Sequence, residues 1–280
     1  MSGLMSVPTK RSVRGTVLWM HGTNFDRSTS VSAPSLQEGI FLSAVFAGGG
    51  YLYLAPDLVG LGVSKDTQAY LYNPSTIDVT LDLLRAAQTI TQGLNRAWNS
   101  DLFVTGFSQG GHDAVVIARE LERLNHPQWR VKAVAGIEGT YNLAELTFPL
   151  LMRGVAPGDS SYLTNLALAC ARYYDQSLET VLNPASADRA RSLFDGDHVK
   201  QIVNHMPADP REMFTPEYLM AFDQHQPNWF LGALQANEDM KPPQDGRWDD
   251  GAQRNLLAIC MRVYNPAGFS VKRQSRSRKN

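Results

Sequence analysis

The chain has 280 residues, of which 43% are hydrophobic and 19% are charged, and its formal net charge at pH 7 is −1. These values are typical of a globular protein that forms one domain with an insertion. A net charge so close to zero gives no general attraction to nucleic acid or to an anionic membrane surface. No apolar run is long enough to span a bilayer, so we expect neither a nucleic-acid partner nor integral membrane association.

The N-terminal residues and the two cysteines bear on the location of the protein and on disulfide or metal sites. Residues 1–14 lack the apolar stretch of a secretory signal, which predicts a cytoplasmic location for the chain as written. Cys170 and Cys260 form neither a disulfide framework nor a cluster with metal-ligand spacing, and we expect both to be buried thiols. We predict neither a cofactor nor a metal.

Four short apolar runs follow one another along the first half of the chain, at residues 16–20, 51–55, 102–105 and 131–137. Each run is nearly continuous in apolar character, as in parallel strands that are covered on both faces. Between the second and third runs, Ile77, Leu81 and Leu84 keep helical spacing after a start signal at Asn73 and Pro74. The alternation predicts an α/β fold with a mostly parallel sheet flanked by helices.

The stretch 141–236 has helical spacing, several prolines and no convincing strand. We interpret it as a helical cap inserted into the sheet domain, which divides the chain into segments 1–140, 141–236 and 237–280. Side chains such as Phe148 and Trp229 would give the cap an apolar surface that favours acyl substrates. The same side chains would serve equally to pack the cap onto the sheet domain.

The pentapeptide Gly106-Phe107-Ser108-Gln109-Gly110 stands between the third apolar run and a helical stretch. It has the pattern of a nucleophile elbow, the sharp strand-to-helix turn that presents a catalytic serine. A serine hydroxyl is a poor nucleophile until such a turn holds it beside a base, and the two glycines leave room for the tight backbone. Ser108 is therefore the candidate nucleophile, and an ordinary glycine-rich turn is the alternative.

Two backbone amides are candidate donors to an oxyanion. The amide of Gln109 lies at the start of the helix, where the positive end of the helix dipole points back toward the elbow serine. His21, Gly22 and Thr23 end the first apolar run, and the amide of Thr23 is the second candidate donor. We expect His21 to orient this loop rather than to act as a base. Asp57, in the turn after the second run, is expected to be structural.

These motifs, in this order, resemble those of α/β-hydrolase esterases and lipases, in particular the branch that includes bacterial and fungal secretory lipases. The resemblance is carried by residues 3–8, 21–23, 55–57, 60–62 and 104–112, and it runs from about residue 3 to about residue 240. It implies an α/β-hydrolase fold with a helical cap between strands six and seven. It also implies a serine ester hydrolase whose acid and histidine follow the cap. Relatives in this branch are often secreted.

The chain departs from the pattern of this branch at both ends. Relatives usually carry further strands before Gly3, and the expected late strand, aspartate and histidine are not found after Ala236. We therefore expect an α/β-hydrolase fold that is incomplete at both ends. For the last forty or so residues we hypothesise a shifted reading frame or a fragment end. The alternatives are a genuine disordered tail at 272–280, rich in basic residues and serine, and a weak nucleic-acid contact through that tail.

A catalytic triad on this fold needs an acid and then a histidine after the nucleophile. The histidines after the elbow are His112, His126, His198, His205 and His225. His225 comes nearest to the expected order, and with Asp197 or Asp195 it would form a substitute dyad. We expect His112 to pack inside the fold. A metal site at His198 and His205 would lack a third ligand with a recognised spacing.

The sequence as a whole predicts an esterase or lipase that cleaves a small-molecule or lipid ester through an acyl-enzyme on Ser108. The amides of Gln109 and Thr23 would hold the oxyanion, with His225 as base and Asp197 as acid. The alternative is a catalytically impaired or truncated hydrolase-like protein that acts as a binding module or has no activity. That alternative follows from the missing late histidine, and the sequence leaves the oligomeric state open.

Overall fold

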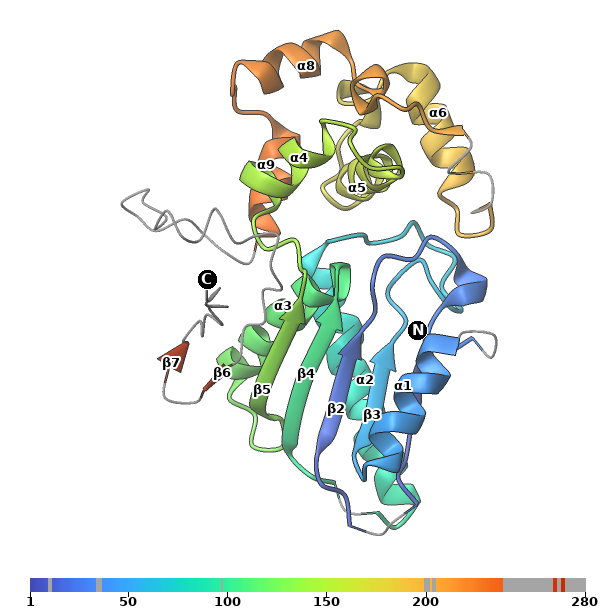
Figure 1. The fold of residues 1–280 in the computed structure, drawn as a ribbon, viewed down its shortest axis with the longest axis vertical. Coiled ribbons are helices and arrows are strands. Elements are labelled where there is room, and N and C mark those ends of the chain that lie inside the picture. The colour runs from blue at the N-terminus through green and yellow to red at the C-terminus, as the bar shows by residue number, and fades with distance from the viewer. Residues whose placement is uncertain are drawn as a thin grey trace, which may run out of the picture.

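The structure is a computed structural model that describes residues 1–9, 12–33, 37–96, 98–198, 202, 205–238, 264–265 and 268–269. A five-stranded sheet carries helices on both faces, and a helical region lies beyond the carboxyl ends of the parallel strands (Figure 1). The predicted α/β fold is therefore confirmed. The predictions for the C-terminal segment, including Cys260 and the basic tail, lie almost wholly outside the described residues.

The sheet has the strand order β1-β3-β2-β4-β5. Its strands are β1 (Gly3–Ser6), β2 (Thr16–Met20), β3 (Leu52–Pro56), β4 (Asp101–Phe107) and β5 (Arg130–Ile137). Strands β2 to β5 pair in parallel with their neighbours, and β1 pairs antiparallel with β3. All four predicted runs are strands, with bounds that agree to within two residues. Residues of β2 and β3 are almost all buried because helices and loops cover both faces.

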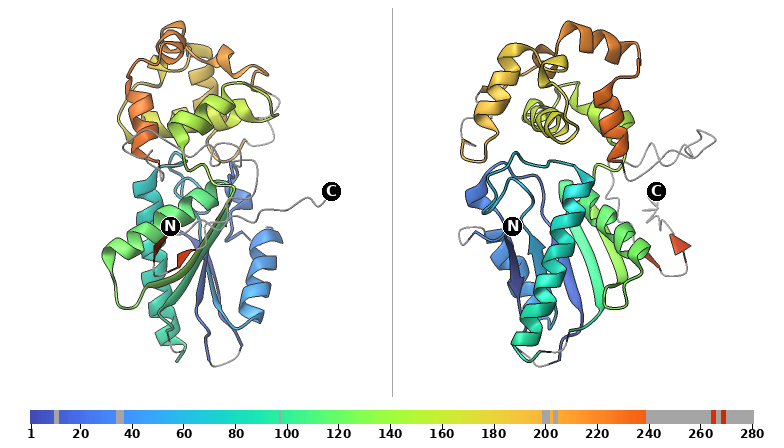
Figure 2. Two further views of the ribbon diagram at one scale, coloured as in Figure 1. Left: turned by 60° about the vertical axis from the view of Figure 1, so that its left-hand side comes forward. Right: turned by 180° about the vertical axis from the view of Figure 1, so that it is seen from behind.

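Three helices flank the sheet. Helix α1 (Gln37–Gly48) lies on one face, and α2 (Asn73–Gly93) and α3 (Gln109–Leu124) lie on the other (Figures 1 and 2). Helix α2 begins at Asn73 with Pro74 in its first turn, as predicted, because proline needs no hydrogen-bond acceptor there. A one-turn helix η1 (Arg27–Thr29) follows β2, and β6 (Tyr264–Asn265) pairs only with β7 (Gly268–Phe269) among the described strands.

We call residues 143–236 the helical region. Its elements are η2 (Leu143–Thr147), α4 (Phe148–Leu151), α5 (Asp159–Tyr173), η3 (Leu178–Thr180), α6 (Pro184–Leu193), η4 (Pro210–Met213), α8 (Pro216–Asp223) and α9 (Trp229–Ala236). Several of these helices begin at a side chain that accepts a hydrogen bond from the first turn; Asn183, Thr215 and Asn228 do so for α6, α8 and α9. The region has its own buried apolar cluster, which includes Cys170 as well as Tyr70 and Leu71 from the loop before α2.

Strand β5 is an edge strand of the described sheet, and most of its side chains are exposed or half-buried. An open edge offers unpaired backbone groups to a strand of another molecule. We expect the protein to self-associate through β5, and we expect Ala133→Lys to weaken association by placing a charge on that edge. Light scattering would then give a mass above 31.0 kDa for the wild type and a lower mass for the variant. A monodisperse wild-type monomer would contradict this expectation.

Candidate active site

Ser108 lies in the turn between β4 and α3 with backbone angles φ 55° and ψ −119°. Residues other than glycine rarely adopt these backbone angles, because the conformation costs about 1–3 kcal/mol. It occurs only where the surrounding structure imposes it. The amide of Ser108 donates to the carbonyl of Ile137 at 2.9 Å, and its carbonyl accepts from the amide of Gly111 at 2.9 Å. The pentapeptide therefore forms a sharp, strained strand-to-helix turn that leaves Ser108 partly exposed.

Glycines allow this turn because the backbone segments around it are in close contact. A Cβ atom added to Gly110 would lie 1.9 Å from the carbonyl oxygen of Met20, and one added to Gly106 would lie 2.2 Å from that of Gly110. Neither position has room for a side chain. The contact with Met20 brings the start of α3 against the end of β2, where residues 21–23 begin.

The loop 21–23 lies directly beside Ser108. A Cβ atom built on Gly22 would be 3.9 Å from the Cβ atom of Ser108. Gln109 is buried and is the first residue of α3, so its amide has no acceptor within the helix. The structure thus gathers Ser108, Gln109 and the Thr23 loop at one place, at the carboxyl ends of β2 and β4.

His21 orients this loop by a hydrogen bond, as expected. Its Nδ1–H donates to the carbonyl of Gly22 at 2.7 Å, and the side chain is buried. Burial lowers the pKa of His21, which favours the neutral ring with a lone pair on Nε2. Within the described part of the chain, that Nε2 atom has no hydrogen-bond partner.

The other histidines have different surroundings. His112 is fully buried, as expected, with Nδ1 3.2 Å from the carbonyl oxygen of Thr140 and Nε2 2.9 Å from Oδ1 of Asn73. His126 stacks on Trp129, and Nδ1 of His198 lies 2.7 Å from Oδ2 of Asp195. The amide of His112 donates to the carbonyl of Ser108 at 3.3 Å, and the ring contacts of His21, His112, His126 and His198 given above are with groups other than the Ser108 hydroxyl.

The structure does not bring His225 and Asp197 together. Asp197 is 69% exposed and forms an ion pair with Arg27 at 2.8 Å. His225 is exposed and follows α8, where it interacts electrostatically with Asp223. Helix α8 lies on the side of the helical region away from the sheet, whereas the chain after α6 approaches η1 (Figure 1). The geometry therefore gives no support to the assignment of His225 as base and Asp197 as acid.

Asp57 is buried in a network of serine contacts. Its carboxylate accepts from the hydroxyl of Ser2 at 2.5 Å and from the amide of Ser32 at 3.1 Å, and the Ser32 hydroxyl also donates to it. These contacts tie the N-terminal strand to the turn after β3. They agree with a structural role.

Tyr70 contacts the candidate site, although no sequence motif indicated this contact. Its hydroxyl lies 3.1 Å from Oγ1 of Thr23, which is 47 positions away along the chain. Burial raises the pKa of Tyr70 well above its ordinary value, so the hydroxyl keeps its proton. A tyrosine in a loop has no motif that would have singled it out.

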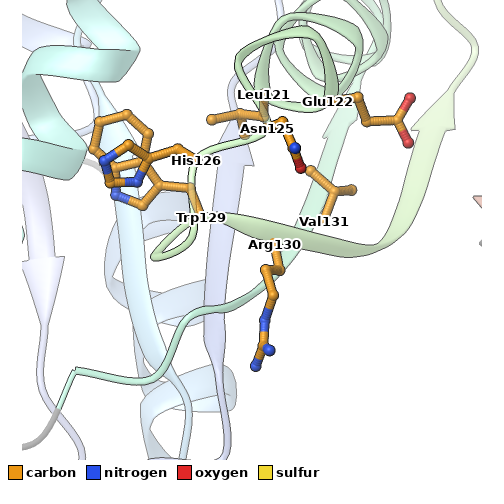
Figure 3. Close-up of a pocket in the computed structure, with 7 residues that line it drawn as sticks. All are labelled: Leu121, Glu122, Asn125, His126, Trp129, Arg130 and Val131. Atoms are coloured by element: carbon orange, nitrogen blue, oxygen red, sulfur yellow. The ribbon is translucent and has the colours of Figure 1, made fainter.

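A separate surface hollow of about 470 Å³ lies at the other end of the sheet (Figure 3). It is lined by residues at the end of α3 and the start of β5, including Asn125, His126 and Arg130. Strand β5 runs from Arg130 to Ile137, and Ile137 pairs with Phe107 next to the elbow. The hollow is therefore remote from Ser108.

Among the described residues, no group of three or more histidine, cysteine, aspartate or glutamate side chains could hold a metal ion. In the same part of the chain, no helix is both long enough and apolar enough to cross a membrane.

Solved structures provide the comparison for this geometry. The chain matches the rice cell wall degrading esterase LipA from Xanthomonas oryzae with a TM-score of 0.75 and 25% identity, over 86% of this chain and 68% of that one. The fold is that of an α/β hydrolase. A Legionella pneumophila protein with a provisional hydrolase assignment matches with a TM-score of 0.75 and 22% identity, over 85% of this chain and 65% of that one.

A more distant match is Candida antarctica lipase A in its closed state, with a TM-score of 0.55 and 16% identity over 85% of this chain and 57% of that one. The resemblance to secretory-lipase-like α/β hydrolases is thus confirmed at the level of structure. The chain spans about two thirds of the length of the Legionella and Xanthomonas proteins. No family model matches the sequence, and no curated protein matches it.

Proposed function

We propose that the protein is a serine hydrolase that cleaves carboxylic esters through an acyl-enzyme on Ser108. The observation that carries the proposal is the strained backbone of Ser108 at a turn between β4 and α3 that only glycines at 106 and 110 allow. The fold shared with LipA, an esterase, supports the same reaction class. The substrate is a carboxylic ester of a small molecule or a lipid.

In the proposed reaction, the Ser108 oxygen attacks the ester carbonyl carbon and the carbonyl oxygen becomes an oxyanion. The amides of Gln109 and Thr23 stabilise that oxyanion, and the positive end of the α3 dipole adds to the effect. A base takes the Ser108 proton during the attack and passes it to the leaving oxygen, so that collapse of the tetrahedral intermediate releases the alcohol and leaves the acyl group on Ser108. Water then attacks the acyl-enzyme and releases the acid.

The reaction needs a base that accepts the Ser108 proton. Catalytic hydrogen bonds are often long in a protein without substrate and shorten when it binds. The loop that carries His21 lies beside Ser108 at Gly22, and the Nε2 atom of His21 has no hydrogen-bond partner among the described residues. A base supplied by His21 would need Nε2 to approach the serine hydroxyl when substrate binds.

A second candidate function is a non-catalytic binding module on the same fold. It is favoured by one observation, that the ring contacts of His21, His112, His126 and His198 given above are with groups other than the Ser108 hydroxyl. The two functions differ in the reactivity of the serine. An activated serine attacks a fluorophosphonate, whereas a serine without a base does so very slowly.

Labelling with a fluorophosphonate therefore tests the proposal. We expect the wild type to be labelled at Ser108, as mapped by mass spectrometry of peptides, and Ser108→Ala to remain unlabelled. Ser43→Ala is the matched control and should label like the wild type; Ser43 is a half-buried residue of α1 whose hydroxyl donates to the carbonyl of Ile40. Equal background labelling of all three proteins would favour the binding module.

A further inference from the structure

The loop of residues 57–72 joins β3 to α2 and is fixed by the helical region. Tyr70 and Leu71 are buried in the apolar cluster of that region. Nδ2 of Asn165 on α5 donates to Oε1 of Gln68 at 2.8 Å, and the Tyr173 hydroxyl donates to the carbonyl of Thr67 at 2.6 Å. The loop belongs to the sheet domain by sequence, but its contacts tie it to α5.

The same loop reaches the candidate oxyanion loop at two neighbouring residues. The Tyr70 hydroxyl lies 3.1 Å from Oγ1 of Thr23, and Nε2 of Gln68 donates to the carbonyl of Asn24 at 2.6 Å. Tyr70 and Gln68 are 5% and 6% exposed and Thr23 and Asn24 are half-buried, so both contacts are partly shielded from water. Hydrogen bonds in such surroundings hold their geometry because no solvent partner replaces them.

Building on the proposed function, we propose that Tyr70 is a positioning residue: its hydroxyl bond to Thr23 holds the Thr23 amide in place as an oxyanion donor beside Ser108. Tyr70 does not touch the reacting atoms. Its ring is packed among residues of the helical region, which fixes the position of its hydroxyl. The hydroxyl in turn contacts the loop that follows β2. The placement of the oxyanion loop thus depends on the packing of the helical region.

This role has a kinetic signature. An oxyanion donor acts on a charge that exists only in the transition state, so misplacing it lowers kcat and leaves KM almost unchanged. A shift of about 1 Å in a catalytic group costs up to about 10²-fold in rate. We expect Tyr70→Phe, which keeps the ring and removes only the hydroxyl, to lower kcat about tenfold or more.

Three variants and a matched control test the contact. Thr23→Val removes the other partner, and the double variant Tyr70→Phe with Thr23→Val should lose no more kcat than either single variant. Tyr174→Phe removes a tyrosine hydroxyl of the helical region that accepts a hydrogen bond from Nδ2 of Asn237, and its kcat should equal that of the wild type. A wild-type kcat in Tyr70→Phe, an additive double variant, or an equal loss in Tyr174→Phe would overturn the proposal.

Amide hydrogen exchange separates this proposal from the proposed function, because it needs no turnover. We expect the peptide that contains residues 21–25 to exchange faster in Tyr70→Phe than in the wild type and at the wild-type rate in Tyr174→Phe. Faster exchange in a protein without esterase activity would support the positioning contact and reject the ester hydrolase. Unchanged exchange in Tyr70→Phe would reject the positioning role whether or not the protein is active.

Discussion

Replacing Ser108 by alanine is expected to lower the initial rate of p-nitrophenyl ester hydrolysis by at least about 10³-fold. Without the hydroxyl no acyl-enzyme forms, and the oxyanion donors alone leave only a small acceleration over water. p-Nitrophenyl esters suit the measurement because p-nitrophenolate leaves without a proton and so needs no general acid. Short and long acyl chains, compared at matched protein concentration, would also show which chain length the site accepts.

Ser108→Ala keeps the Cβ atom and the turn, so we expect its melting temperature to stay near that of the wild type. Ser43→Ala controls for the loss of a serine elsewhere and should keep full activity. If wild type and Ser108→Ala hydrolyse the esters at the same near-background rate, the protein is a hydrolase-like module without this activity. Activity that survives in Ser108→Ala would place the reaction at another residue.

Gly110→Ala should destabilise the protein strongly. The new Cβ atom would lie 1.9 Å from the carbonyl oxygen of Met20, a backbone atom that cannot rotate away. Overpacking against side chains typically costs about 1–3 kcal/mol, and we expect the upper end of this range or more because β2 or α3 must move. In a chain of this size that corresponds to a fall in melting temperature of roughly 6–12 °C.

Gly232→Ala is the matched control for this substitution. Gly232 lies within α9, and a Cβ atom there would meet no atom within 4 Å. Alanine is the better helix former, so we expect Gly232→Ala to raise the free energy of unfolding by about 0.5–1 kcal/mol. Thermal unfolding followed by circular dichroism measures both variants. A Gly110→Ala protein as stable as the wild type would show that the elbow can relax.

The strands and the elbow could be predicted because their signals are local. A buried parallel strand needs a nearly continuous apolar run, and each of the four runs is one. The elbow needs small residues at fixed positions relative to Ser108, and the pentapeptide 106–110 contains them. Helix α1 gave a weaker signal, because Ile40, Phe41 and Val45 face solvent and the helix lacks a clear polar face.

The candidate site beyond the elbow could not be predicted because its contacts join distant segments. Asp197 lies between the elbow and His225 in chain order, which made it a plausible acid, but the fold pairs it with Arg27, 170 positions earlier. Tyr70 and Thr23 are brought together only by the way the loop before α2 crosses the end of β2. No spacing rule in a single sequence encodes either contact.

The boundary between the sheet domain and the helical region that follows from the sequence is not the boundary that follows from side-chain packing. Tyr70 and Leu71 precede α2 in the sequence, yet they are buried among side chains of residues 143–234. A deletion of the helical region, or its exchange for that of another hydrolase, would therefore leave these two apolar side chains uncovered on the remaining core. Transplanting the helical region to change substrate preference would require residues 67–71 to be moved with it.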